Sequence, residues 1–261
     1  MINFNKSQND LKKYEEIGFV FPIDVVSHQE INKIRKDFEL AEYELRNDPK
    51  RLSLLRSYPA QLLPSFDTLI RNDNLIAAAS SVLGPNLMVW SSGMFIKEAK
   101  SSKIVSWHQD LTYWGLNNAE ETTCWVALSS ANKESGCMKF IPGSHKTGVI
   151  DAGHDLETTS YPLWTLDNDK VLELAERGGC VAPTGPAGSM LMFSSLLVHA
   201  SPPNISPFGR SIVYLSLCHV DNHIQKFNRD EWIAHRDFTP ISKLNDNCLD
   251  ELISQSLTAA E

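Results

Sequence analysis

The stretch Ser-Trp-His-Gln-Asp-Leu-Thr-Tyr-Trp at 106–114 predicts both a metal site and the kind of fold that builds one. In an extended segment, successive side chains alternate between two faces, so His108 and Asp110 point to the same side. Two histidines and one carboxylate form the facial triad that holds Fe(II) in non-heme oxygenases. The third ligand must come from a separate strand, and His199, at the end of the apolar run 190–199, is the candidate. Distant strands meet in this way around the interior of a β-barrel.

Short apolar or alternating runs separated by turn residues dominate the chain after residue 86. Such runs are typical of strands. With the helical pattern that precedes them, they predict a mainly β protein, a barrel or jelly roll with N-terminal helices packed on one face. The predicted strands are 87–96, 104–110, 123–129, 137–141, 188–195 and 210–220.

Two helices are predicted in the first third of the chain. Ser27 and Glu30 have capping-box spacing, and apolar residues then recur at helical intervals up to about Asn47. A second helix is predicted from about Asn74 to a stop at Gly84. We also expect the polar stretch 144–180 to cross the barrel mouth and residues 246–256 to form a terminal helix.

The composition limits the class of protein. The chain has 261 residues, of which 42% are hydrophobic and 21% charged, so we expect one globular domain over 1–261. A net charge of −8 disfavours nucleic-acid and membrane partners. No apolar run approaches the roughly 20 residues of a membrane helix, and the start lacks the apolar core of a secretory signal. Five cysteines without Cys-x-x-Cys spacing favour reduced thiols. We therefore expect a cytoplasmic monomer or homodimer.

A cosubstrate with a carboxylate is predicted from the next strand. Arg210 opens the run 210–218, and its planar guanidinium fits a distal carboxylate such as C5 of 2-oxoglutarate. Ser201, two residues after His199, places a hydroxyl donor for the same group. Fe(II) held by three protein ligands keeps adjacent positions open for a chelating 2-oxoacid and dioxygen.

Several segments together resemble the phytanoyl-CoA dioxygenase family of Fe(II)/2-oxoglutarate-dependent oxygenases. They are Trp-His-Gln-Asp-Leu-x-Tyr at 107–113, Trp125, Glu-Ser-Gly-Cys-Met-Lys-Phe-Ile-Pro-Gly-Ser-His-Lys at 134–146, His-x-Ser at 199–201, and Arg210. They occur in the family's order, and the start with Glu-Ile-Gly-Phe-Val at 16–20 also fits.

The resemblance implies a double-stranded β-helix, or jelly-roll, fold. It assigns Fe(II) to His108, Asp110 and His199, with 2-oxoglutarate as cosubstrate and ascorbate as a helpful reductant. The residues that it assigns to the 2-oxoglutarate site are Arg210, Ser201, Trp125, Lys97 and Met94.

The expected reaction is hydroxylation of an unactivated C–H bond of a small polar metabolite. Dioxygen is consumed, and 2-oxoglutarate leaves as succinate and CO2. Asp110 separates the chain from related halogenases, in which a small residue leaves room for chloride. Tyr113 and Trp114 directly follow the ligand pair and are expected to face the substrate. The polar residues of 144–180 favour a compact polar substrate.

Three alternatives stay open at this point. The first is an acyl-CoA hydroxylase of the same family, and the second is a non-catalytic jelly-roll module that binds a ligand. The third is a zinc hydrolase with the same three ligands. A complete triad with Arg210 argues against the second, and no general-base carboxylate for zinc is evident in the sequence.

Overall fold

The computed structural model describes residues 4–114, 116, 120–154 and 164–221. Among these residues, no helix combines the length and the apolarity that crossing a membrane requires. The predicted terminal helix at 246–256 lies outside the described residues. The helices are α1 (Phe4–Ile17), α2 (His28–Glu44), α3 (Pro49–Ser57), α4 (Pro59–Leu62), α5 (Pro64–Ile70), α6 (Asp73–Leu83), α7 (Leu111–Trp114), α8 (Asn168–Gly178) and the 3-10 helix η1 (Ser144–Thr147).

Local capping explains where the two predicted helices begin. Ser27 and Glu30 form the predicted capping box at the start of α2, each side chain bonding the other residue's backbone N–H. Asn72 accepts from two backbone N–H groups at the start of α6, and Gly84 caps its end. Both predicted helices are therefore confirmed, with ends shifted by one to three residues.

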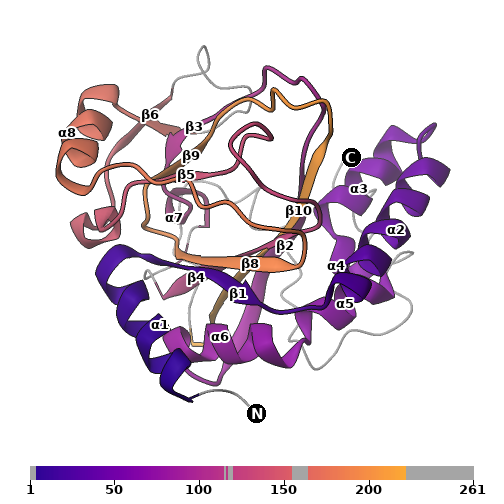
Figure 1. Ribbon diagram of the computed structural model, residues 1–261, viewed down its shortest axis with the longest axis horizontal. Coiled ribbons are helices and arrows are strands. Elements are labelled where there is room, and N and C mark those ends of the chain that lie inside the picture. The colour runs from indigo at the N-terminus through magenta and orange to yellow at the C-terminus, as the bar shows by residue number, and fades with distance from the viewer. Residues whose placement is uncertain (1–3, 115, 117–119, 155–163, 222–261) are drawn as a thin grey trace, which may run out of the picture.

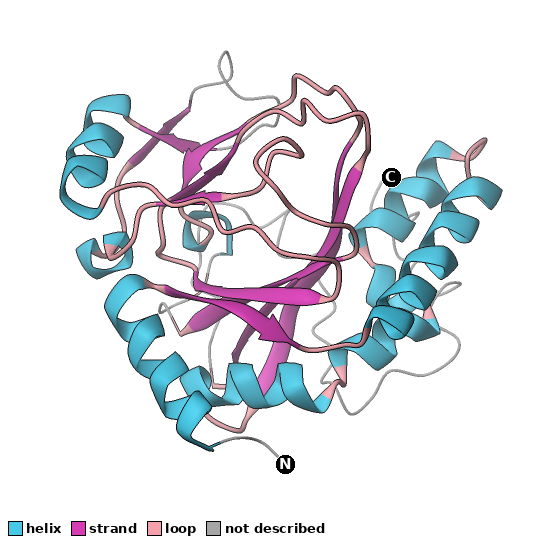
Figure 2. Cartoon of the chain, viewed as in Figure 1, coloured by secondary structure: helices cyan, strands magenta, loops and turns pink. Residues whose placement is uncertain are grey.

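The strands form two main antiparallel sheets. One has five strands in the order β1-β8-β4-β10-β2, the second has three in the order β3-β9-β5, and β6 pairs with β7. The two main sheets lie across from one another (Figure 2). The strands are β1 (Phe19–Asp24), β2 (Leu87–Lys97), β3 (Val105–His108), β4 (Glu121–Ala127), β5 (Lys139–Phe140), β6 (Ala152–His154), β7 (Trp164–Leu166), β8 (Ser189–Ser194), β9 (His199–Ser201) and β10 (Arg210–His219).

The five-stranded sheet carries buried apolar residues on both faces because each face meets a different layer. One face packs against the N-terminal helices, through buried side chains that include Leu75 of α6 and Val126 of β4. These helices lie along and beside the sheet (Figure 1). The other face meets the three-stranded sheet, where Phe19 of β1 stacks on Phe140 of β5 with ring centroids 5.1 Å apart. This is the predicted jelly roll with helices on one face.

Part of the segment 144–180 packs on the outside of the barrel. Val171 and Leu174 of α8 are buried against Val198 and, among partly buried residues, Trp107 of β3. Trp107 is adjacent to His108 in the strand, so it lies on the opposite face. The expectation that this polar stretch only crosses the barrel mouth is therefore wrong for α8, which contributes buried apolar residues. Its residues 155–163 lie outside the described part.

Candidate metal centre

Two neighbouring strands bring the predicted histidine ligands together. His108, the last residue of β3, and His199, the first residue of β9, are direct partners in the antiparallel ladder. Both are buried, and their ring centroids are 4.1 Å apart. Asp110 follows β3 by two residues, just before α7. The pairing of β3 with β9 thus assembles the three side chains that the sequence predicts as a site.

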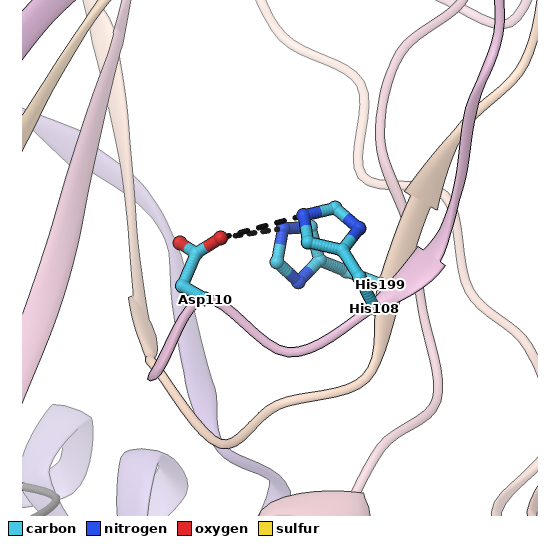
Figure 3. Close-up of side chains that lie close together, drawn as sticks. All are labelled: His108, Asp110 and His199. Carbon is cyan, nitrogen blue, oxygen red and sulfur yellow. Dashed lines mark ion pairs between the residues drawn. The ribbon is translucent and has the colours of Figure 1, made fainter. Parts of the chain in front are cut away.

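The ligand atoms converge as a metal site requires. His108 Nε2 and His199 Nε2 lie 3.4 Å and 3.5 Å from the same oxygen, Asp110 Oδ1 (Figure 3). All three ligand atoms lie within 4.8 Å of one another. Two ligands at right angles, each about 2.1 Å from a metal ion, are about 3 Å apart. The side chains therefore fit a divalent ion bound on one face.

Backbone carbonyls select the tautomer that binds metal. His108 Nδ1 lies 2.8 Å from the carbonyl of Ser106, and His199 Nδ1 lies 2.9 Å from the carbonyl of Leu197. A carbonyl only accepts, so each Nδ1 carries the proton and each Nε2 directs a lone pair toward Asp110. Burial, and secondarily His108, lower the pKa of His199 to about 4, against the opposing effect of Asp110. At neutral pH this imidazole is therefore in the uncharged form that binds a metal.

Asp110 is held as a carboxylate. Burial would raise its pKa, but His199, His108 and a hydrogen bond from Thr123 together outweigh burial and leave the pKa below its ordinary value. The Thr123 hydroxyl donates to Oδ2, 2.9 Å away, which is the oxygen that does not face the imidazoles. The other carboxylate oxygen, Oδ1, faces both imidazoles and is left for a metal ion.

Gln109, between the two ligands, has a structural role that sequence reasoning missed. Its amide nitrogen donates to the carbonyls of Gly148 (2.9 Å) and Leu196 (2.7 Å), and its amide oxygen accepts from the N–H of Ile150 (2.8 Å). Strand alternation indicates that this side chain points away from the ligand face, but no local pattern identifies its distant partners. It ties the segments at 148–150 and 196 to the ligand pair.

Arg210 and Trp125 lie on the interior side of the five-stranded sheet. Arg210 is 1% exposed, and its Cζ lies 5.5 Å from the centroid of the Trp125 ring. Arg210 Nη1 donates to the carbonyl of Gly136, which also accepts from the hydroxyl of Ser201 at 2.9 Å. The structure thus brings Arg210, Ser201 and Trp125 together, as predicted.

Lys97 lies with Arg210, Ser201 and Trp125, whereas Met94 does not. The two basic side chains, Arg210 and Lys97, together with Ser201 and Trp125 are called the cationic group below. Lys97 is the ladder partner of Arg210, is 1% exposed, and donates to the carbonyl of Ser201 at 3.0 Å. Burial, followed by the charge of Arg210, lowers its pKa to about 7. Met94 lies on the other face of β2, packed against the core beneath the helices, as strand alternation over three residues requires. The expectation that Met94 lines the 2-oxoglutarate site is therefore wrong.

The two aromatic residues after Asp110 have different surroundings. The Tyr113 ring meets His108 edge-on, with centroids 5.9 Å apart. Trp114 is buried in a small cluster with Trp90 and Cys218. Trp114 is therefore a packing residue in this cluster. Of the two aromatic residues, Tyr113 is the one that lies beside a metal ligand.

The chain matches the family model described as phytanoyl-CoA dioxygenase over residues 14–212. It is 28% identical over 256 residues to an ectoine dioxygenase of Streptomyces anulatus, with 89% of this chain and 86% of that protein covered. Its fold is that of the non-heme monooxygenase ThoJ, with a TM-score of 0.75, 20% identity, and 96% and 94% of the two chains covered. EctD from S. alaskensis with 2-oxoglutarate and 5-hydroxyectoine gives a TM-score of 0.70 at 23% identity, with 95% and 86% covered.

Replacing His199 tests the metal site. We expect His199→Ala to weaken Fe(II) binding by more than about 100-fold, because one of the three protein ligands is lost. Anaerobic equilibrium dialysis with metal analysis measures this loss, and circular dichroism checks that the fold persists. His219→Ala, at the far end of β10, is the control and should bind one equivalent. One equivalent of Fe(II) bound tightly to His199→Ala would remove His199 from the ligand set.

Proposed function

The chain belongs to the phytanoyl-CoA dioxygenase family of Fe(II)/2-oxoglutarate-dependent oxygenases, and we propose that it hydroxylates an unactivated C–H bond of a small, charged metabolite. The observation that carries the proposal is the presence, inside one barrel, of a metal-ligand triad and a buried pair of cations. The triad is made by His108, Asp110 and His199, and the cations are Arg210 and Lys97. A module that only binds ligands has no need for both.

The triad residues are proposed to hold Fe(II). When bound, Fe(II) and 2-oxoglutarate activate dioxygen, and the cosubstrate leaves as succinate and CO2. The contribution of His108 and His199 is to present two neutral nitrogens on one side, while Asp110 supplies one negative charge. Their burial keeps bulk water from the reacting atoms, which favours hydroxylation of the substrate over side reactions.

The cationic group is proposed to bind the distal carboxylate of 2-oxoglutarate. Arg210 offers a planar pair of N–H donors, Ser201 offers a hydroxyl, and the Trp125 ring holds the guanidinium in place. These donors now bond the carbonyl of Gly136, a neutral acceptor that a carboxylate outcompetes. Thr123, which bonds Asp110, and Trp125, which packs on Arg210, are two residues apart on β4. The same strand face thus spans from the metal ligands to the cations.

The proposed substrate is a compact metabolite with charged groups. Relatives that align with most of this chain include ectoine dioxygenases, and a structural neighbour is described with 2-oxoglutarate and 5-hydroxyectoine. Tyr113, beside His108, is proposed to contact the substrate. Cytoplasmic location, a single domain, a monomeric or homodimeric state and a benefit from ascorbate stay predictions.

Arg210→Ala should weaken 2-oxoglutarate binding by about tenfold to a hundredfold, because a charge-assisted contact worth about 1.5–3 kcal/mol is removed. Titration calorimetry of the Mn(II)-loaded protein measures this affinity without turnover. Arg177→Ala, which removes an exposed guanidinium from α8, is the matched control. An unchanged dissociation constant for 2-oxoglutarate in Arg210→Ala would show that the arginine is structural.

Lys97 should make cosubstrate binding dependent on pH. With a pKa of about 7, the free Lys97 side chain is mostly neutral at pH 8, and a carboxylate beside it favours the charged form. Binding of 2-oxoglutarate at pH 8 is therefore expected to take up as much as about 0.9 proton per site, and clearly less at pH 6. Calorimetry in buffers of different ionisation enthalpy measures the uptake. Lys97→Met should abolish it, and equal uptake by that variant would contradict the assignment.

The substrate class is tested by succinate release. With Fe(II), 2-oxoglutarate and ascorbate present, we expect small zwitterions, ectoine among them, to stimulate succinate formation well above the uncoupled rate. Long-chain acyl-CoAs are the comparison. Stimulation by acyl-CoA alone would contradict the proposed substrate and favour the acyl-CoA hydroxylase alternative.

A further inference from the structure

A second carboxyl group lies buried behind the metal ligands. Glu121, the first residue of β4, is 1% exposed and lies on the same strand face as Thr123. The hydroxyl of Thr123 lies between two carboxyls, 2.9 Å from Asp110 Oδ2 and 3.4 Å from Glu121 Oε1. Asp110 Oδ2 faces away from the imidazoles (Figure 3), and Glu121 adjoins Asp110 on this side through Thr123.

The proton count sets the direction of these contacts. Thr123 has a single hydroxyl proton, and the shorter contact directs it to Asp110. The oxygen of Thr123 is then left as an acceptor toward Glu121, so a favourable contact needs a proton on Glu121. Two ionised carboxylates facing one hydroxyl would instead repel each other.

The surroundings of Glu121 favour its neutral form. Burial is the main cause that raises the pKa of Glu121 well above its ordinary value, and the charge of Asp110 raises it further. The hydroxyls of Ser195, Ser216 and Thr123 oppose this rise only in part. Within the described part of the chain, no cation forms an ion pair with Glu121. An unpaired charge in such a place is costly, and protonation removes that cost.

We propose that Thr123 and a neutral Glu121 are positioning residues of the metal centre. Thr123 holds Asp110 so that one oxygen faces both imidazoles, and Glu121 supports Thr123 without adding a second negative charge. The inference rests on the metal centre of the proposed function.

The arrangement has a chemical consequence at the metal. With Oδ2 engaged by Thr123, Asp110 would present one oxygen, Oδ1, to a bound metal ion. A second carboxylate oxygen on the metal would fill a position that the cosubstrate or dioxygen needs. The hydrogen bond from Thr123 to Oδ2 would thus leave a coordination position for the cosubstrate or dioxygen.

The role of Thr123 is tested by Co(II) binding, followed through the visible absorption that reports the geometry of the ion. Thr123→Val should weaken Co(II) binding by about 10- to 100-fold and change the spectrum. Thr123→Ser keeps the hydroxyl and should return both to within about threefold of the parent. Thr122→Val is the matched control: Thr122 is equally buried and adjacent on β4, but its hydroxyl bonds Tyr14 and the carbonyl of Phe193. It should bind Co(II) normally.

Two substitutions test Glu121. Glu121→Gln is neutral and can still donate, so it should bind Co(II) within about twofold of the parent. Tenfold weaker binding would show that Glu121 carries a charge and would overturn its neutral role. Glu121→Leu removes the donor and should weaken binding about three- to tenfold. Parental affinity in Glu121→Leu would remove Glu121 from the arrangement.

Co(II) binding distinguishes failure of the proposed function from failure of the positioning role of Thr123 and Glu121. If the unchanged protein binds no Co(II), the proposed function itself fails. If it binds Co(II), and Thr123→Val matches it in affinity and spectrum, then only the positioning role is wrong. Thermal unfolding of each variant, compared with Thr122→Val, separates loss of metal binding from loss of the fold.

Discussion

The requirement that governs this structure is the approach of three ligand atoms to within a few ångströms from residues far apart in the sequence. His108 and His199 meet because β3 and β9 are antiparallel neighbours and place the two residues opposite each other. A slip of one residue in this ladder would turn one imidazole out of the barrel. The apolar packing between the sheets, in which Phe140 contacts both Phe193 and His199, opposes such a slip. The apolar packing that fixes the register of β3 and β9 therefore also fixes the positions of the two histidine ligands.

β4 connects the two halves of the site. Its interior face carries Glu121, Thr123 and Trp125 in succession, which reach from the back of Asp110 to the guanidinium of Arg210. A strand repeats a side-chain direction every two residues, about 6.8 Å, so the spacing between metal and cations is built into the backbone. β4 lies in the middle of the five-stranded sheet, where both edges are paired and movement is most restricted.

The sequence predicted the features that short-range patterns encode. The triad, Arg210, Ser201, Lys97 and the capped helices follow from spacing, alternation and family motifs. Other features depend on contacts between distant segments. β1 was not among the predicted strands, because the first third of the chain was expected to be helical, yet it pairs with β8 at an edge of the sheet, where Pro22 is tolerated. Met94 was misplaced by one strand face, and Glu121 and Gln109 have roles that only the three-dimensional structure reveals.

Gln109 makes the rigidity of the metal centre depend on segments that are distant from it in the sequence. Its three hydrogen bonds fasten Gly148, Ile150 and Leu196 to the backbone between His108 and Asp110. A substitution before Ile150 in that segment therefore acts on the same rigid unit as the metal. Gln109 itself is not a metal ligand, yet loss of its amide would free these segments from one another and from the ligand pair. A residue that only links distant segments of backbone can thus decide how rigidly a metal ion is held.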